Sequence, residues 1–104
     1  MKRITIGRGD GNDIAINHDS VSRRHAQLVE RDDGQYQLLD LGSSNGTFYF
    51  AEGGWTDTRG AMLGADDMVR IGEHSTSVAA LLFEVGIAPS RPANVEISTK
   101  VIKK

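Results

Sequence analysis

The chain has 104 residues, of which 38 % are hydrophobic and 25 % charged, and its formal net charge at pH 7 is −2. This length suits one domain, and the slightly acidic balance argues against a general nucleic-acid binder, which carries a basic excess. The lack of cysteine excludes disulfide bonds and thiolate metal sites. Because the sequence shows neither a secretory signal nor an apolar run near the roughly 18 residues of a membrane span, we expect a cytoplasmic protein without membrane insertion.

Short segments with β-strand character follow one another along the first half of the chain. In order they are residues 3–6, 13–16, 25–30, 36–39 and 47–50. The turn residues Asp33 and Gly34 separate the third segment from the fourth, which is typical of a β-hairpin. Residues 42–46, with the sequence GSSNG, predict another turn before the aromatic fifth segment.

The second half continues with a predicted loop and two further strands. Residues 51–60 predict a loop, whereas residues 68–71 and 78–85 predict the last strands of the core. By composition, residues 79–82 also suit a short helix, but a strand is the preferred interpretation. Short strands with turns at intervals of roughly 8–12 residues are typical of an all-β sandwich or barrel, and the 12 glycines of the chain fit the many tight turns of such a fold.

The end of the chain differs in character from the rest. Both prolines lie within residues 88–94, which predict a linker, and residues 95–102 alternate apolar and polar side chains. This alternation fits a strand, whereas a terminal tail is more often disordered. We therefore expect a binding domain over residues 1–87, followed by a linker and a C-terminal strand or tail over residues 88–104.

Three polar clusters fall on predicted loops or strand ends, where a β-sandwich displays its binding surface. Arg8 and Arg23 carry guanidinium forks that match phosphate geometry. Ser22 and Ser44 add hydroxyl groups and Asn45 adds an amide, so the set is rich in donors and suits a phosphate group with its three acceptor oxygens. Taken singly, these residues are ordinary surface and turn residues. The clusters are residues 7–8, 21–26 and 42–47.

Other interpretations of these residues are weaker. Ser22, His25 and Asp40 superficially match a hydrolase triad, but the sequence has no G-x-S-x-G elbow and no identifiable oxyanion hole. The glycine-rich residues 7–11 lack the Lys-Ser/Thr pair that completes a P-loop. The three histidines do not have metal-ligand spacing. We therefore expect no enzymatic activity, no cofactor and no metal.

The ordered combination of these motifs resembles the forkhead-associated (FHA) domain family. The resemblance extends over residues 4–83, and the matching pieces are ITIGR at 4–8, NDI at 12–14, VSRRHAQL at 21–28, YQLLDLGSSNGTF at 36–48 and LGADDMVRIG at 63–72. It implies an FHA-like β-sandwich of about ten to eleven strands with its binding loops at one end. It also implies recognition of phosphothreonine in an extended peptide, on a partner phosphorylated by a Ser/Thr kinase.

Five residues match the positions with which the family contacts its ligand. By resemblance, Arg8 bonds the phosphate and braces its loop, and Ser22 bonds a phosphate oxygen. Arg23 contacts the phosphate or the peptide backbone, and Ser44 lies near the phosphate. Asn45 holds the peptide main chain beside the phosphothreonine.

Three further residues match structural positions of the family. By resemblance, Gly7 ends the first strand, His25 braces the loop that carries Ser22, and Gly46 permits a tight turn with positive φ. These residues are therefore expected to support the site rather than to contact the ligand.

The sequence departs from the family pattern at two places. Family members carry roughly two strands ahead of the one at residues 3–6, and an exposed sheet edge in their place invites pairing. Residues 95–102 are a candidate to fill this gap, either within one chain or by strand exchange in a homodimer. Residues 49–60 differ from the family's short hairpin, a departure that affects the peptide-reading surface more than the phosphate site. A phosphate-independent scaffold domain is the alternative function.

Overall fold

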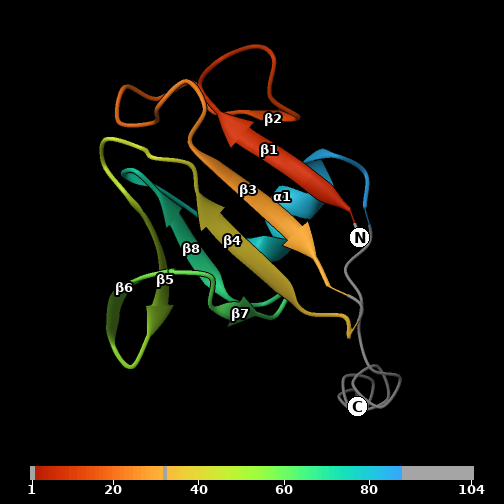
Figure 1. Ribbon diagram of the computed structural model, residues 1–104. Helices are drawn as coiled ribbons and strands as arrows, with labels where there is room; N and C mark the ends of the chain where they lie inside the picture. The colour runs from red at the N-terminus through yellow and green to blue at the C-terminus, as the bar shows by residue number, and fades with distance from the viewer. Residues whose placement is uncertain (1, 32, 88–104) are drawn as a thin grey trace, which may run out of the picture.

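The computed structural model describes residues 2–31 and 33–87. These residues form two β-sheets and one short helix (Figure 1). They contain nine strands, against the ten to eleven expected. The elements in chain order are β1 (Arg3–Gly7), β2 (Ile14–Ala15), β3 (Ala26–Glu30), β4 (Tyr36–Asp40), β5 (Thr47–Ala51), β6 (Gly54–Asp57), β7 (Met62–Leu63), β8 (Met68–Ile71), β9 (His74–Ser77) and α1 (Val78–Glu84).

The first sheet has the strand order β2-β1-β3-β4-β7. Its central strands are antiparallel, and their register places Ile4 opposite Leu28 and Leu28 opposite Leu38. All three side chains are buried, because alternate residues of a strand point to the same face. The period-two pattern of these segments therefore builds one wall of the core.

The second sheet has the order β6-β5-β8-β9 and supplies the opposite wall. Its buried residues Val69 and Ile71 belong to the same apolar cluster as the inward residues of the first sheet. Two sheets that share one core make a β-sandwich, which confirms the all-β class expected from the sequence. The six strands expected before residue 72 agree with the structure to within one residue at either end.

The prediction of a loop over residues 51–60 is wrong in part, because β6 occupies residues 54–57 and pairs with β5. Glu52 and Gly53 connect the two strands and have φ values of 52° and 82°. Positive φ at both central residues is the signature of a type I′ hairpin turn. Since Glu is not a typical residue for that turn, the residue types at 52 and 53 are only a weak signal for this hairpin.

The prediction of a strand over residues 78–85 is also wrong, because Val78–Glu84 is the helix α1. Ser77 caps it by accepting a hydrogen bond on its hydroxyl from the backbone N–H of Ala80. Val78, Leu81 and Leu82 are buried, and this three-to-four-residue spacing directs one helix face into the core. At seven residues, this helix is too short to cross a bilayer, and the described residues contain no other.

The fold collects several loops at one end of the sandwich. In Figure 1, the loop after β1, the loop before β3 and the connection between β4 and β5 lie at the same end as the β8–β9 turn. All three polar clusters of the sequence fall on this end. Residues 88–104, with the predicted linker and the alternating segment 95–102, lie outside the described residues, so the predicted strand exchange stays a prediction.

Candidate functional site

Gly7 brings the end of β1 against the loop that precedes β3. A Cβ atom at Gly7 would lie 2.2 Å from the backbone oxygen of Arg23, so no side chain fits there. This close approach allows two backbone hydrogen bonds, from Arg8 N to Ser22 O at 2.9 Å and from Gly9 N to Arg23 O at 3.1 Å. Because Gly7 has no side chain, the end of β1 packs closely against the loop before β3, and this packing sets the position of Arg8.

Arg8 is braced by the loop that it faces. Its Nε donates a hydrogen bond to the backbone oxygen of Val21 at 2.9 Å. Among the described residues, its two terminal nitrogens have no hydrogen-bond partner and no ion pair. One edge of the guanidinium group is thus anchored, while its outer nitrogens remain available to an anion.

His25 ties the Ser22 loop to the loop between β4 and β5. The ring is fully buried, its Nδ1 accepts from Ser22 N at 3.0 Å, and its Nε2 lies 2.8 Å from the backbone oxygen of Gly46. Because Nδ1 accepts, Nε2 carries the proton and donates to Gly46. Ser44 N adds a third tie by donating to the hydroxyl oxygen of Ser22 at 3.1 Å.

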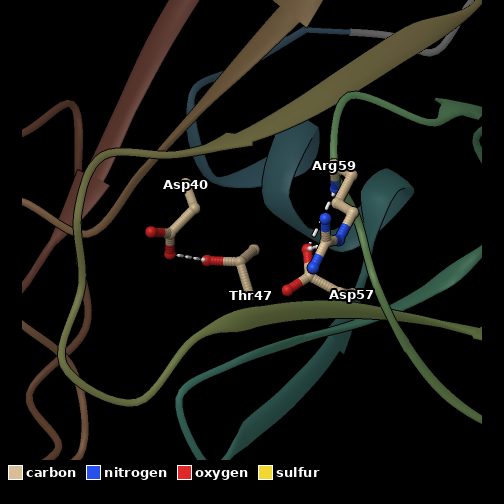
Figure 2. A network of polar contacts seen from close by, with 4 residues as sticks. All are labelled: Asp40, Thr47, Asp57 and Arg59. Carbon is tan, nitrogen blue, oxygen red and sulfur yellow. Dashed lines mark hydrogen bonds and ion pairs between the residues drawn. The ribbon is translucent and has the colours of Figure 1, made fainter.

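Asp40, at the end of β4, organises the β4–β5 loop. Its carboxylate accepts from the backbone N–H groups of Gly42 and Ser43 and from the hydroxyl groups of Ser43 and Thr47. Figure 2 shows the contact with Thr47, which has a length of 2.7 Å. Partial burial acts to raise the pKa of Asp40, but the bonds from Ser43, Thr47 and Gly42 outweigh it and hold the pKa below its ordinary value of 3.8.

Gly46 closes the same loop in a conformation that other residues avoid. Its φ is +89°, and a Cβ atom there would lie 2.7 Å from the ring of Phe48. Its N–H donates to the hydroxyl of Ser43 at 2.9 Å, and its carbonyl oxygen accepts from both His25 and Gly72. Backbone conformation and packing both favour glycine at this position.

Asn45 reaches across to a residue that the sequence did not single out. Its Nδ2 donates to the backbone oxygen of Ser20 at 2.8 Å, and the hydroxyl of Ser20 accepts from Glu73 N at 2.8 Å. A Cβ atom at Gly72 would lie 2.5 Å from the Ser20 oxygen, so the β8–β9 turn packs directly on Ser20. The hydroxyl of Ser20 is also 2.8 Å from Nδ1 of His18.

Sequence reasoning missed the supporting roles of Ser20, Asp40 and Gly72. For Asp40 a signal existed, since an Asp two residues before a Gly-Ser pair is typical of an Asx turn. No local pattern marks Ser20, because its contact with Glu73 joins residues 53 apart in the chain.

Two adjoining hollows are lined by arginines of this end of the molecule. The Arg8 hollow, of about 180 Å³, is lined by Arg8, Gly9, Asp10 and Arg23. The Arg24 hollow, of about 330 Å³, is lined by Thr5, residues 9–12, Arg23 and Arg24. The structure thus brings Arg8 and Arg23 to one hollow and joins Ser22 with Ser44, whereas Asn45 lies against Ser20.

The electrostatics of this end favour an anion. In the part of the chain that the structure describes, Arg59 and Asp57 form the only ion pair (Figure 2), and both line a third hollow together with Ser44 and Asn45. The arginines of the two hollows therefore have no carboxylate partner. Exposed guanidinium groups together with free hydroxyl and amide donors can bind a phosphate or carboxylate through charge-assisted hydrogen bonds.

The sandwich and its cluster of donor-bearing loops define a β-sandwich binding module. Residues 4–72 match the family model described as the FHA domain, so the chain belongs to the FHA domain family, as the sequence motifs indicated. The oxoglutarate dehydrogenase inhibitor of Corynebacterium diphtheriae is 38 % identical over 69 residues, which are 66 % of this chain and 45 % of that protein. The chain spans less than half the length of the curated relatives that it matches.

Solved structures agree with this assignment. The FHA domain of the CT664 protein from Chlamydia trachomatis has a TM-score of 0.61 and 29 % identity, with coverage of 71 % of this chain and 72 % of that one. EmbR of Mycobacterium tuberculosis, in a complex with a low-affinity phosphopeptide, has a TM-score of 0.58 and 33 % identity, with coverage of 72 % and 19 %.

Proposed function

We propose that this chain is a non-enzymatic, phosphothreonine-dependent docking module for a protein phosphorylated by a Ser/Thr kinase. The observation that carries the proposal concerns Arg8, which is anchored through Nε and lines the Arg8 hollow beside Arg23, while its terminal nitrogens have no partner among the described residues. A phosphate carries about −1.5 to −2 charge at pH 7 and three strong acceptor oxygens, which suits two guanidinium groups without acidic partners.

The hydrogen-bond inventory of the serines fits a phosphate. The hydroxyl oxygen of Ser22 accepts from Ser44 N, so its own proton is directed elsewhere and is available to a phosphate oxygen. Ser44 is exposed on the β4–β5 loop, and its hydroxyl adds a further donor. Arg8, Arg23, Ser22 and Ser44 then supply the phosphate contacts.

Asn45 has the groups to hold the peptide backbone. One hydrogen of its Nδ2 is used by Ser20 O, which leaves the second hydrogen and the Oδ1 acceptor free. A side-chain amide with one donor and one acceptor complements the C=O and N–H of an extended peptide. Gly7, His25 and Gly46 contribute by fixing the loops rather than by contact with the peptide.

Similarity to other family members supports the proposal. The EmbR structure contains a phosphopeptide, and the C. diphtheriae relative is named as an inhibitor of another protein. Both descriptions fit a domain that acts by binding. For this chain, the partner is proposed by chemical class only, as a phosphothreonine-bearing protein.

The test is a binding measurement with an oriented phosphothreonine peptide library and its unphosphorylated copy. We expect micromolar binding that needs the phosphate and is lost in Arg8→Ala. Arg31→Ala is the matched control, because Arg31 is an exposed arginine of the β3–β4 turn. Equal binding of both libraries by wild-type protein would favour the phosphate-independent scaffold instead.

A further inference from the structure

The Arg24 hollow is larger than the Arg8 hollow and has no role in the contacts proposed so far. The two hollows share Gly9, Asp10 and Arg23 in their linings. Arg8 lines only the first, and Arg24 lines only the second. Arg23 therefore lines both hollows, whereas Arg8 and Arg24 each line one of them.

The walls of the Arg24 hollow are held in place by hydrogen bonds. Nδ2 of Asn12 donates to the backbone oxygens of Gly9 and Arg23, both at 2.8 Å, which pins the loop after β1 to the loop before β3. A Cβ atom at Gly9 would lie 2.8 Å from Cγ of Arg23, so the stem of Arg23 lies directly over this glycine. The shape of the Arg24 hollow is thus set by hydrogen bonds and packing between the two loops.

The charges around the Arg24 hollow favour an anionic group. Arg23 and Arg24 are exposed and have no ion pair among the described residues, while Asp10 is the one acidic residue of the lining. Asp13 lies nearby, but its carboxylate accepts hydrogen bonds from the backbone and side chain of Thr5. The lining therefore contains two guanidinium groups and one carboxylate.

We propose that the Arg24 hollow is a second anion subsite, which takes a carboxylate or a second phosphate of the same phosphothreonine peptide, with Arg24 as its specific contact. This inference rests on the proposed function, because the peptide must first be held at the Arg8 hollow. Arg23 contributes to both subsites. Arg24 then sets which phosphothreonine sequences bind most tightly, without being required for phosphate recognition.

The experiment scans an anion along a phosphothreonine peptide that has alanine at all other positions. Glutamate is placed at each position before and after the phosphothreonine in turn, and phosphoserine is scanned in the same way. Dissociation constants are measured for wild-type protein, Arg24→Ala and the control Arg31→Ala. The glutamate and phosphoserine series separate a carboxylate ligand from a phosphate ligand.

We expect one position, or two adjacent ones, at which glutamate tightens binding by about twofold to fivefold, the range of an exposed ion pair. This gain should vanish in Arg24→Ala and persist in Arg31→Ala, while the all-alanine phosphopeptide binds all three proteins alike. Lysine at the same position should weaken binding to wild-type protein and strengthen it in Arg24→Glu.

Two results would overturn the subsite. One is a scan without any position that gains affinity, and the other is a gain of the same size in Arg24→Ala. If the all-alanine phosphopeptide fails to bind wild-type protein or binds Arg8→Ala equally well, the proposed function itself fails, and the subsite fails with it. A gain confined to phosphoserine would identify the subsite as one for doubly phosphorylated peptides.

Discussion

The side-chain amide of Asn45 donates a hydrogen bond of 2.8 Å to the backbone oxygen of Ser20, a residue 25 positions earlier in the chain. Since Ser20 also accepts from Glu73 through its hydroxyl, one serine connects the β4–β5 loop with the β8–β9 turn. The orientation of the amide that we propose holds the peptide is thus set by a residue outside the three motif clusters.

Replacing Asn45 by alanine should weaken phosphopeptide binding by about tenfold, because two hydrogen bonds to the peptide backbone are lost at roughly 1 kcal/mol each or less. Titration calorimetry would measure the effect. The melting temperature should change little, since Asn45 is exposed. Asn17→Ala, an exposed asparagine of the loop before β3, is the control that should bind like wild type.

Replacing Ser20 by alanine should lower stability more than it lowers affinity. The variant keeps the backbone oxygen that orients Asn45 but loses the acceptor of Glu73 N, at a cost of about 1 kcal/mol. Urea unfolding and peptide titration of the same preparation would separate the two effects. A large loss of affinity with unchanged stability would contradict this assignment.

Replacing Gly7 by alanine should destabilise the fold and abolish peptide binding together. The added Cβ would meet a backbone oxygen at 2.2 Å, and overpacking of this kind costs about 1–3 kcal/mol or more. Gly11→Ala is the matched control, because nothing lies within 4 Å of its added Cβ. Equal melting temperatures for the two variants would show that the end of β1 can move away from Arg23 without loss of stability.

Replacing His25 by alanine should cost about 2–4 kcal/mol, since it empties a buried site and removes the partners of Ser22 N and Gly46 O. Denaturant unfolding measures this directly. His18→Ala, which removes an exposed ring and its hydrogen bonds with Ser20, should cost clearly less than His25→Ala because no buried site is emptied.

The Asp40 carboxylate makes the free energy of unfolding depend on pH. Its folded-state pKa lies below the ordinary value of 3.8, so it contributes stability that is present above that value and is lost as the pH falls through the folded-state pKa. Unfolding free energies of wild-type protein and Asp40→Asn should therefore differ near neutral pH and converge as the pH falls through the folded-state pKa of Asp40. A difference that does not shrink at all as the pH falls below 3.8 would contradict this role.

The sequence predicted those parts of the fold that depend on local patterns. The strand character of residues 3–6, 25–30 and 36–39, together with the turn residues Asp33 and Gly34, identified three strands of the first sheet. Residues 78–85 were assigned wrongly, since an apolar run of this length suits a strand or a helix, and the cap at Ser77 and the core contacts of α1 decide the matter. The turn at Glu52 was missed because its residue type is unusual for positive φ.

For the candidate site, the motifs identified the loops but not all of their connections. Arg8, Ser22 and Asn45 were singled out from spacing and resemblance, and the structure places them on one end of the sandwich. The contact between Ser20 and Glu73 depends on how two sheets pack, which no local pattern encodes. That Arg24 forms no ion pair among the described residues, although Asp10 lines the same hollow, likewise follows only from the folded structure.

The carbonyl oxygen of Gly46 receives hydrogen bonds from His25 of one loop and Gly72 of another, so these loops are fixed to each other when the protein folds. The binding loops are then already ordered before a ligand binds, so the protein loses little conformational entropy on binding. Association should be a single diffusional step, accelerated by the arginines and slowed by salt. Differences among peptides should accordingly appear in how long each complex lives rather than in how fast it forms.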